Sequence, residues 1–347
     1  MELDMPKAIG RVVALRDLSR KEMRAVMRLI MTGEATESQI GGFLIGLRMK
    51  GESVDEIAGA AEVMRDLATY VDVDQKSLVD TCGTGGSGAA KFNVSTASAF
   101  VAAASGARVA KHGNRAASGK SGSADLLEAA GAEIMLSPDQ VAQCINTVGV
   151  GFMFAVNHHS AMKHAIGARR EMVVRTIFNM LGPLTNPARA RRQILGVYDG
   201  SLLRPVAEVL RQLGSEHVMV VNAEDGLDEI SISAVTHVVE LKHGEITKYE
   251  LSPEDFGFSK SSLEELKVEN AEQSLELVRK SLVGAHEAAS DIVALNAGAA
   301  IYVSGEASSL EVGVEMAKDS MRNGLAMRKI NEFVDLTQQI STAEHGG

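Results

Sequence analysis

The residues between Asp80 and Asp125 have the types and spacing needed to hold a highly charged anion. The stretch DTCGTGGSGAAKFNVSTASAF satisfies the pattern G-x-G-x-x-G with Gly83, Gly85 and Gly88. Glycines let backbone N–H groups approach phosphate oxygens closely, and the following NVST is expected to open a helix whose positive end attracts anions. No acidic residue lies between Asp80 and Asp125, whereas basic residues occur there at Lys91, Arg108, Lys111, Arg115 and Lys120. The segment therefore indicates a ligand that carries several phosphates.

Dinucleotide-binding folds share this glycine pattern, but the second predicted strand of this chain lacks the acidic residue that they require. Those folds place an Asp or Glu about 20 residues after the glycines, where it binds a ribose. Here the second strand ends in VAKHGNR, with Lys111, His112 and Arg115. A Walker loop is also excluded, because G-x-x-x-x-G-K-[ST] does not occur. A simple tight turn at GTGG stays open as the alternative when that pattern is considered alone.

The elements before this segment are predicted to be helices. Residues 1 to about 72 contain capping boxes at Ser19 to Glu22, Thr36 to Gln39 and Ser53 to Glu56. In each box a hydroxyl caps the helix and a Glu or Gln reaches back to the first backbone N–H. We therefore expect a small, entirely helical N-terminal domain over residues 1–72.

From Leu78 onward, short apolar strands alternate with helices. SLVDTC, ARVAK and AEIML are separated by helices near 95–105 and 123–130, and a further helix starts at Ser137-Pro138. Such alternation predicts a mostly parallel sheet with helices on both faces. Later strands are expected at RQILGVY, at HVMVVN and in a hairpin that turns at His243-Gly244, before a helical ending from about 272 to 340. The predicted fold is α/β over residues 73–347, preceded by the helical domain.

Composition excludes several classes of function. The 347 residues are 45% apolar and carry a formal net charge of −10, which argues against a general nucleic-acid surface. Cys82 and Cys144 are too few for a disulfide framework or a cysteine zinc site. The N-terminal stretch lacks the apolar centre of a signal peptide, and no run of about 18 apolar residues follows. We expect a cytoplasmic protein without a membrane span.

Several motifs together resemble the anthranilate phosphoribosyltransferases of tryptophan biosynthesis, in order along essentially the whole chain. They are GTGGSG, FNVSTASAF, KHGNRAASGKSGSAD, HHSAMKH, RTIFNMLGPLTNP and DGLDEIS. The resemblance implies transfer of the phosphoribosyl group of phosphoribosyl pyrophosphate (PRPP) to the amino group of anthranilate, with Mg²⁺ present as two ions alongside PRPP. It further implies an active site between a helical and an α/β domain, a homodimer formed through the helical domain, and a helical insertion near 160–182 that packs on that domain.

The resemblance also assigns residues to PRPP. Gly83, Gly85, Gly86 and Ser87 would follow the pyrophosphate, Lys111 would place a charge on the phosphates, and the ribose phosphate would lie near Ser118, Gly119 and Ser123. The complete set implied is Gly83, Gly85, Gly86, Ser87, Lys91, Asn93, Val94, Ser95, Thr96, Lys111, His112, Gly113, Asn114, Arg115, Ser118, Gly119 and Ser123. For Ser95 taken alone, a plain helix N-cap is the alternative, and for the basic residues a solvated loop.

Anthranilate and metal ligands are implied in the same way. The anthranilate set is Gly83, Asn114, Ala155, His159, Arg169, Gly182 and Pro183, in which Arg169 would grip the carboxylate with its planar guanidinium. Ser95, Asp228 and Glu229 would hold magnesium, although an acidic pair in a loop is more often simply solvated. Histidines in such a cleft suggest base catalysis. We expect them to position the substrate instead, because an aromatic amine is already neutral at pH 7.

This sequence departs from the family pattern at two positions beside the glycines. Position 87 is Ser where the family has Asp, and position 91 is Lys where a small polar residue is usual. The two changes shift the local charge by about +2, which favours phosphate and weakens loop contacts to magnesium. Three alternatives are kept: a pyrimidine nucleoside phosphorylase of similar fold, a non-enzymatic relative that binds nucleic acid, and the already disfavoured dehydrogenase.

Overall fold

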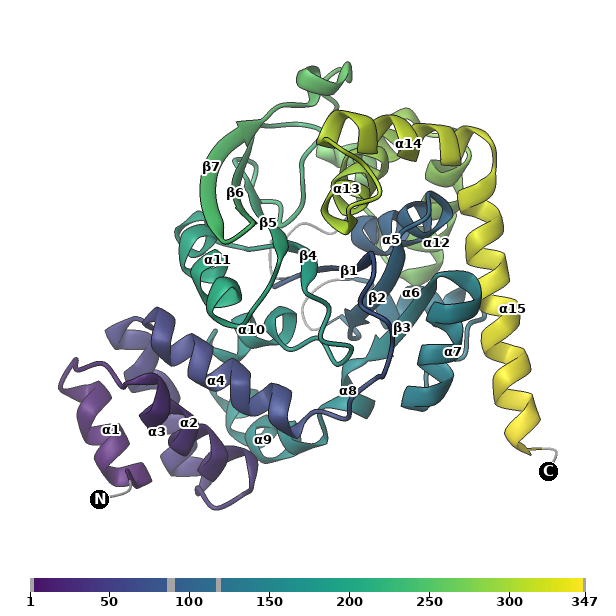
Figure 1. Ribbon diagram of the computed structural model, residues 1–347. Helices are drawn as coiled ribbons and strands as arrows, with labels where there is room; N and C mark the ends of the chain where they lie inside the picture. The colour runs from purple at the N-terminus through teal and green to yellow at the C-terminus, as the bar shows by residue number, and fades with distance from the viewer. Residues whose placement is uncertain (1–2, 86–90, 117–119, 346–347) are drawn as a thin grey trace.

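The chain was analysed in a computed structural model that describes residues 3–85, 91–116 and 120–345. Its N-terminal part is a helical bundle (Figure 1). The bundle is formed by α1 (Met5–Val13), α2 (Arg20–Met31), α3 (Glu37–Lys50) and α4 (Val54–Leu67). Complete capping boxes start α2, α3 and α4 at Ser19, Thr36 and Ser53, as the sequence predicts.

Within the described residues, seven strands form one sheet in the order β3-β2-β1-β4-β5-β6-β7. Strands β1 to β5 run parallel, whereas β6 and β7 form the antiparallel hairpin that turns at His243-Gly244. Their bounds are β1 (Leu78–Gly83), β2 (Arg108–Gly113), β3 (Val150–Phe154), β4 (Arg192–Gly196), β5 (His217–Ala223), β6 (Thr236–Lys242) and β7 (Glu245–Leu251). The predicted fold class, a helical domain with a mostly parallel α/β domain, is confirmed.

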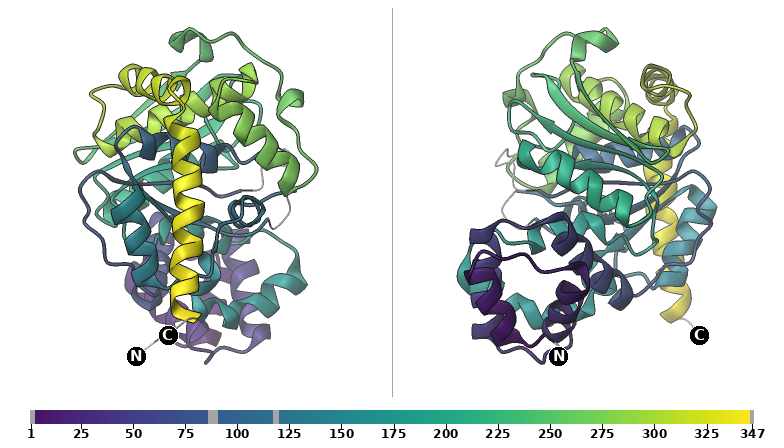
Figure 2. Two further views of the ribbon diagram at one scale, coloured as in Figure 1. Left: turned by 90° about the vertical axis from the view of Figure 1, so that its right-hand side faces the viewer. Right: turned by 60° about the vertical axis from the view of Figure 1, so that its left-hand side comes forward.

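Helices cover both faces of the sheet. The connections near the strand ends contribute α5 (Val94–Ala104), α6 (Ser123–Ala129), α7 (Pro138–Val148), α8 (Ala155–His158), α9 (Lys163–Met172), α10 (Phe178–Leu181) and α11 (Leu203–Gln212). The C-terminal part adds α12 (Ala271–Leu282), α13 (Glu287–Ser304), α14 (Leu310–Arg322) and α15 (Leu325–His345), and α15 runs along the outside of the molecule (Figure 2). Short 3-10 helices lie at 160–162, 182–184, 200–202, 253–256 and 263–266.

The two faces of the sheet belong to two different hydrophobic cores. In β5, Met219 and Val221 pack into the core built with α5 and α13, whereas Val218 and Val220 pack into a core shared with α11 and the helical bundle. Ala165 of α9 and Phe178 of α10 also lie in this second core. Strands buried on both faces must be apolar at successive positions, which is the pattern of HVMVVN. The bundle is therefore packed directly against one side of the α/β part.

The prediction of a strand at AEIML is wrong. Ala132, Ile134 and Leu136 are buried as a strand would require, but residues 132–136 pair with no strand. The backbone N–H of Glu133 donates to the Thr337 hydroxyl of α15 instead. The edge position beside β2 is occupied by β3, whose sequence VGFMF was not among the expected strands.

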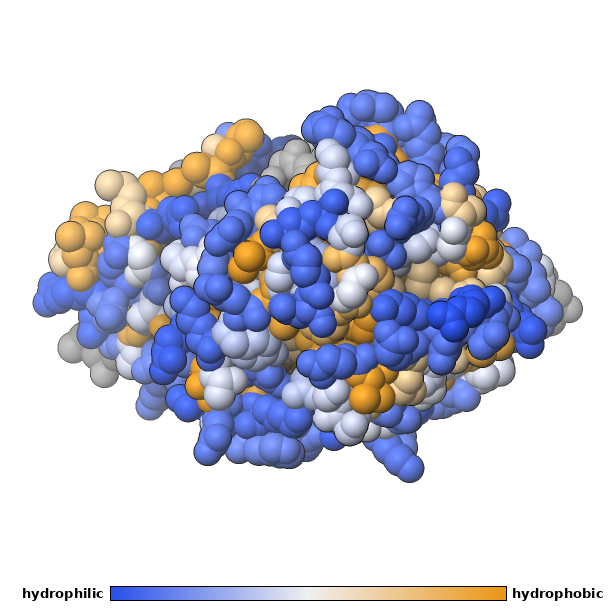
Figure 3. Space-filling view, turned by 90° about the horizontal axis from the view of Figure 1, so that it is seen from above, coloured by the Kyte–Doolittle hydropathy of each residue, from blue (hydrophilic) through white to orange (hydrophobic). Residues whose placement is uncertain are grey.

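The surface is mostly hydrophilic, with local exceptions. Figure 3 shows hydrophobic side chains gathered at the left of the view, where the helical bundle lies. Val13, Leu15 and Met49 of the bundle are exposed, as is Val173 after α9. In the part of the chain that the structure describes, no helix combines the length and apolarity needed to cross a bilayer.

Candidate active site at the carboxyl ends of the parallel strands

The site lies where the strand order reverses, because β1 is flanked by β2 on one side and by β4 on the other. Ligands of open α/β sheets bind beyond the carboxyl ends of strands at such a point. Here the segment at Asp228 crosses the strand ends in close contact with two glycines. A Cβ on Gly83 would lie 2.6 Å from the Asp228 carboxylate, and a Cβ on Gly196 would lie 1.6 Å from its carbonyl oxygen. Only glycine fits at these two strand ends.

Asp228 and Glu229 form a largely buried acidic pair beside the glycine turn. Lys91 Nζ lies 2.8 Å from Asp228 Oδ1 and 2.7 Å from Glu229 Oε2. The Gly85 N–H donates to Asp228 Oδ2 over 3.0 Å, from a backbone with φ of +66°. Burial by itself would raise the pKa of Asp228, but the Lys91 ammonium outweighs burial and lowers it, whereas burial raises the pKa of Glu229. The two carboxylates therefore form a largely buried site for a cation, which the Lys91 ammonium occupies.

Lys111 is buried beneath the start of α5. Its Nζ donates to the Thr81 carbonyl over 2.5 Å and to Ser95 Oγ over 3.3 Å. Burial lowers its pKa, opposed by the carboxyl of Asp80. Among the described residues, no carboxylate forms an ion pair with this ammonium within 4.0 Å. Its positive charge is therefore available to an anion at the strand ends.

The start of α5 is tied to the loop before α6. Asn93 is the N-cap residue, but its side chain makes no capping hydrogen bond. Instead its Oδ1 accepts from Ser121 Oγ (2.7 Å) and from Ser274 Oγ of α12 (2.6 Å), and its Nδ2 donates to the Ser121 carbonyl. Thr96 donates to Ser123 Oγ over 3.1 Å. The alternative that Ser95 is the N-cap is therefore excluded.

Two other predicted residues at these loops serve the packing. Val94 is completely buried, so only its backbone can face a ligand. A Cβ on Gly113 would lie 2.8 Å from the Phe152 ring, so glycine lets β2 end against β3.

His112 and His159 lie together, with ring centroids 5.0 Å apart. Burial, followed by the charges of His159 and His158, moves the pKa of His112 well below its ordinary value. Burial lowers the pKa of His159 to about 4. A hydrogen bond to the Gly182 backbone partly opposes the lowering of the pKa of His112. The Gly182-Pro183 turn therefore lies next to this pair of histidines. The Nε2 atoms of both rings have no hydrogen-bond partner in the described part of the chain. Both imidazoles are neutral at pH 7.

Arg169 projects from α9 and is half-buried. Its guanidinium lies 5.3 Å from the centre of the Phe178 ring, and burial lowers its pKa. It makes no ion pair with a carboxylate among the residues described. Ala155, which opens α8 directly after β3, is also half-buried. A planar cation without a carboxylate partner suits a carboxylate ligand.

Two other predicted residues directly follow the carboxyl end of β2 and are exposed. Arg115 is exposed and pairs with Asp125 and Glu128, so its charge is already neutralised. Asn114 is exposed, and its side-chain oxygen accepts from the Arg115 N–H. The predictions for Gly86, Ser87, Ser118 and Gly119 lie outside the described residues.

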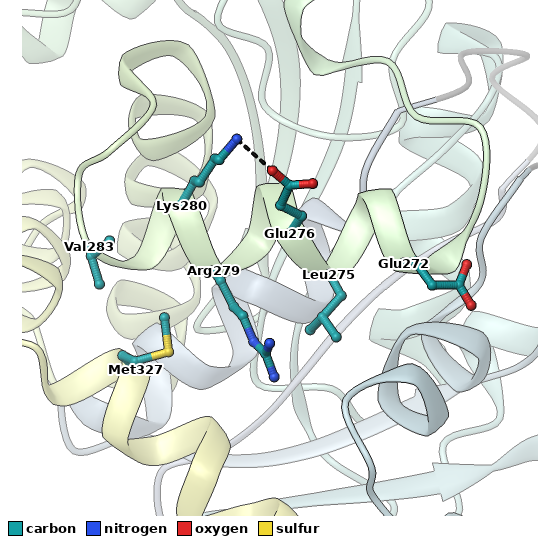
Figure 4. A pocket seen from close by; sticks show the side chains of 7 residues that line it. All are labelled: Glu272, Leu275, Glu276, Arg279, Lys280, Val283 and Met327. Carbon is teal, nitrogen blue, oxygen red and sulfur yellow. Dashed lines mark ion pairs between the residues drawn. The ribbon is translucent and has the colours of Figure 1, made fainter.

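A hollow away from the strand ends lacks the acidic pair, the buried lysine and the histidines of the site. It measures about 390 Å³ and is lined by α12 residues together with Met327 of α15. Figure 4 shows Lys280 paired with Glu276 at 2.8 Å on one side of α12, whereas Arg279 and Leu275 lie on the side nearer Met327. None of the predicted site residues lines it. It is a surface groove between helices.

Comparison with known proteins agrees with this geometry. The family model described as "Glycosyl transferase family, a/b domain" matches residues 75–327, and the one described as "Glycosyl transferase family, helical bundle domain" matches residues 6–68. A protein of Ectopseudomonas mendocina named anthranilate phosphoribosyltransferase is 58% identical over 99% of this chain and 100% of its own length. One of Cellvibrio japonicus with the same name is 61% identical over 97% of this chain and 100% of its own length. The chain belongs to the anthranilate phosphoribosyltransferase family.

Solved structures of the family share the fold. The crystal structure from Thermus thermophilus matches with a TM-score of 0.90 and 41% identity, covering 95% of this chain and 99% of its own. The structure from Saccharomyces cerevisiae in complex with PRPP and Mg matches with a TM-score of 0.87, 24% identity and coverage of 96% and 98%. The latter likeness concerns the fold alone.

The structure also shows supporting residues that the motifs did not reveal. Asn296 of α13 holds the segment after the acidic pair, because it accepts from the Ile230 N–H and donates to the Ile230 carbonyl. Gln193 of β4 donates to the Pro183 carbonyl over 2.7 Å and so fixes the Gly182-Pro183 turn. Both are buried amides in apolar segments. A polar residue inside an otherwise apolar run was the signal available for them.

Proposed function

We propose that this chain transfers the phosphoribosyl group of PRPP to the amino group of anthranilate and releases pyrophosphate, as a step of tryptophan biosynthesis. Membership of the family supports this assignment. The observation that carries it is the buried ammonium of Lys111, which lies against Thr81 of β1 and Ser95 of α5 without a carboxylate partner among the described residues. A buried cation left unpaired is costly unless a ligand supplies the negative charge.

The reaction is a nucleophilic displacement at C1 of the ribose. The C1–N bond forms, the C1–O bond to the diphosphate breaks, and the nitrogen then releases its extra proton. Negative charge grows on the departing diphosphate. Lys111 and the start of α5 stabilise that charge. The dinucleotide alternative requires a carboxylate at the end of β2, where Lys111 lies instead.

The residues around Asp228 fit a magnesium ion. The two carboxylates are adjacent, largely buried and already face one cation, the Lys91 ammonium. The described residues contain no group of three or more His, Cys, Asp or Glu side chains suited to a metal. Phosphate oxygens would therefore complete the coordination, as hard Mg²⁺ prefers. Asp228, Glu229 and Ser95 would hold the ions, two per PRPP, and the bound metal would neutralise diphosphate charge. A Saccharomyces cerevisiae relative of the same fold was solved with PRPP and Mg, which supports magnesium as the metal.

Anthranilate is assigned to the side of the cleft formed by α8, α9 and the Gly182-Pro183 turn. Arg169 binds its carboxylate, and the unpartnered Nε2 of His159 accepts a hydrogen bond from the amino group. The pKa of His159, lowered to about 4, makes this imidazole a weak base. Positioning of the amine fits this histidine better than proton abstraction does.

We also propose the organisation of the molecule. Residues 1–72 form the helical domain and residues 73–347 the α/β domain. A helical insertion near 160–182 packs on the helical domain, since α9 and α10 share the core of the bundle. A homodimer through the bundle is supported by the exposed Val13, Leu15 and Met49. We also assign the protein to the cytoplasm.

Loss of anthranilate fluorescence with PRPP, measured with and without Mg²⁺, tests the function. Turnover should require both PRPP and the metal. In parallel, the same protein is given a pyrimidine nucleoside and inorganic phosphate. Phosphorolysis in that arm, with anthranilate unchanged in the first, would overturn the assignment in favour of a nucleoside phosphorylase.

A further inference from the structure

The contact of Lys91 with the acidic pair is not explained by the reaction or by the small polar residue that the family usually has at position 91. The Lys91 ammonium lies within 2.8 Å of both carboxylates of the acidic pair. The side chains are enclosed, with 13% of Lys91, 9% of Asp228 and 12% of Glu229 exposed. No other cation of the described residues lies within ion-pair distance of this pair. Lys91 is therefore the counter-ion of the acidic pair in the substrate-free protein.

The backbone of Lys91 is held in place by a distant segment. Lys91 forms an isolated antiparallel bridge with Lys267, and the Phe92 N–H donates to the Leu266 carbonyl over 3.0 Å. The next residue, Asn93, is fixed by Ser274. The Lys91 side chain thus extends to the acidic pair from a backbone that is held in place. Lys111 cannot replace it, because its ammonium is bound to the Thr81 carbonyl.

The ammonium and a divalent ion compete for the same carboxylate oxygens. A magnesium ion needs direct contact with oxygen ligands at about 2.1 Å. An ammonium that already contacts both carboxylates occupies that space, and its charge would repel the metal in a poorly solvated site.

We propose that Lys91 is a resident cation that keeps divalent metal off the acidic pair until the diphosphate arrives. This inference rests on the assignment of Asp228 and Glu229 to the metal. The diphosphate brings additional negative charge, which lets the ammonium move to phosphate oxygens while the metal takes the carboxylates. The metal therefore binds this chain together with PRPP and not before it.

Equilibrium binding of Mn²⁺ to the protein without PRPP tests the proposal, with free metal measured by electron paramagnetic resonance. The wild type should bind Mn²⁺ at the acidic pair only weakly. Lys91→Met should strengthen that binding about tenfold or more, because the competing charge is gone while the carboxylates stay. The same change at exposed Lys267, which pairs with Glu264 outside the site, is the matched control and should leave binding unchanged. Equal Mn²⁺ affinity in the wild type and Lys91→Met would overturn the proposal.

The wild type alone provides a second test that does not depend on folding of the lysine variant. If the wild type binds Mn²⁺ tightly without PRPP, and Asp228→Asn removes that binding, the metal already occupies the pair and the proposal is wrong. If Mn²⁺ binds tightly only after PRPP is added, the proposal holds. Failure of the proposed function is distinguishable, because it would appear as absent turnover of anthranilate, which none of these binding measurements requires.

Discussion

Basic side chains lie at both ends of the parallel strands, but they differ in whether carboxylates of the protein pair with them. At the carboxyl ends, Lys111 is buried and bonded to a backbone carbonyl and hydroxyls. At the amino ends a cavity of about 490 Å³ opens between the bundle and the sheet. Its basic lining residues are Arg20, Arg24, Arg65, Arg189 and Arg191.

Most of the arginine charge at the amino ends is neutralised within the protein. Arg20 and Arg24 pair with Glu62, and Arg191 pairs with Glu216. A count of basic residues would therefore mark both ends as anion sites. Arg65 at the amino ends also lacks a carboxylate partner among the described residues, but its side chain is only half-buried. What distinguishes the carboxyl ends is the fully buried, unpaired ammonium of Lys111 at the start of a helix. The comparison teaches that desolvated and unpaired charge, more than its amount, indicates the ligand.

The largest expected effect comes from removing that cation. Lys111→Met should lower kcat/KM for PRPP about a thousandfold, because the diphosphate loses a preorganised charge in a dry site. Stability should not fall, since an unpaired buried charge is removed. Arg191→Met at the opposite ends is the matched control and should leave turnover unchanged. Steady-state kinetics and urea unfolding provide both readouts. Equal losses of turnover in the two variants would erase the distinction between the ends.

The next effect separates the two substrates within the carboxyl-end site. Arg169→Lys keeps the charge but loses the planar guanidinium that binds a carboxylate in two places. The KM for anthranilate should rise about tenfold to a hundredfold, while the KM for PRPP stays constant. A rise in the KM for PRPP instead would place Arg169 on the phosphate side.

The buried histidines make the carboxyl ends sensitive to pH, whereas the arginines stay charged. Burial lowers the pKa of His159 to about 4, so the unfolded chain, at about 6.5, takes up its proton first. The contribution of the neutral His159 ring to the free energy of unfolding is fully present above about pH 6.5. It is lost as the pH falls toward about 4. Between about pH 7 and pH 5 the free energy of unfolding should drop by about 2 kcal/mol from this group alone. Urea titrations should show a smaller drop for His159→Asn. An unchanged pH dependence in that variant would contradict a neutral buried ring.

The sequence predicted what depends on local signals. Ser19, Thr36 and Ser53 start helices because a capping box is complete within four residues. The glycines and Lys111 were predicted as ligands of a phosphate because their chemistry follows directly from residue type. The strand at AEIML failed, because alternation reports burial and not which neighbour supplies hydrogen bonds. The contact of Lys91 with Asp228 joins residues 137 positions apart, which no local pattern encodes.

The smallest expected effect concerns Arg65 at the amino ends. Its guanidinium donates to the Leu184 and Leu213 carbonyls and so links α4 to the α/β part. Burial, followed by the charge of Arg189, lowers its pKa to about 10, so it stays charged at pH 7. Arg65→Met loses the two hydrogen bonds but also the repulsion from Arg189, so the free energy of unfolding should fall by only about 1 kcal/mol. Turnover should stay within about threefold of the wild type, because no substrate charge reaches this end. If anthranilate turnover fell as strongly as it does in Lys111→Met, the two ends would share one role, and unpaired buried charge would no longer separate them.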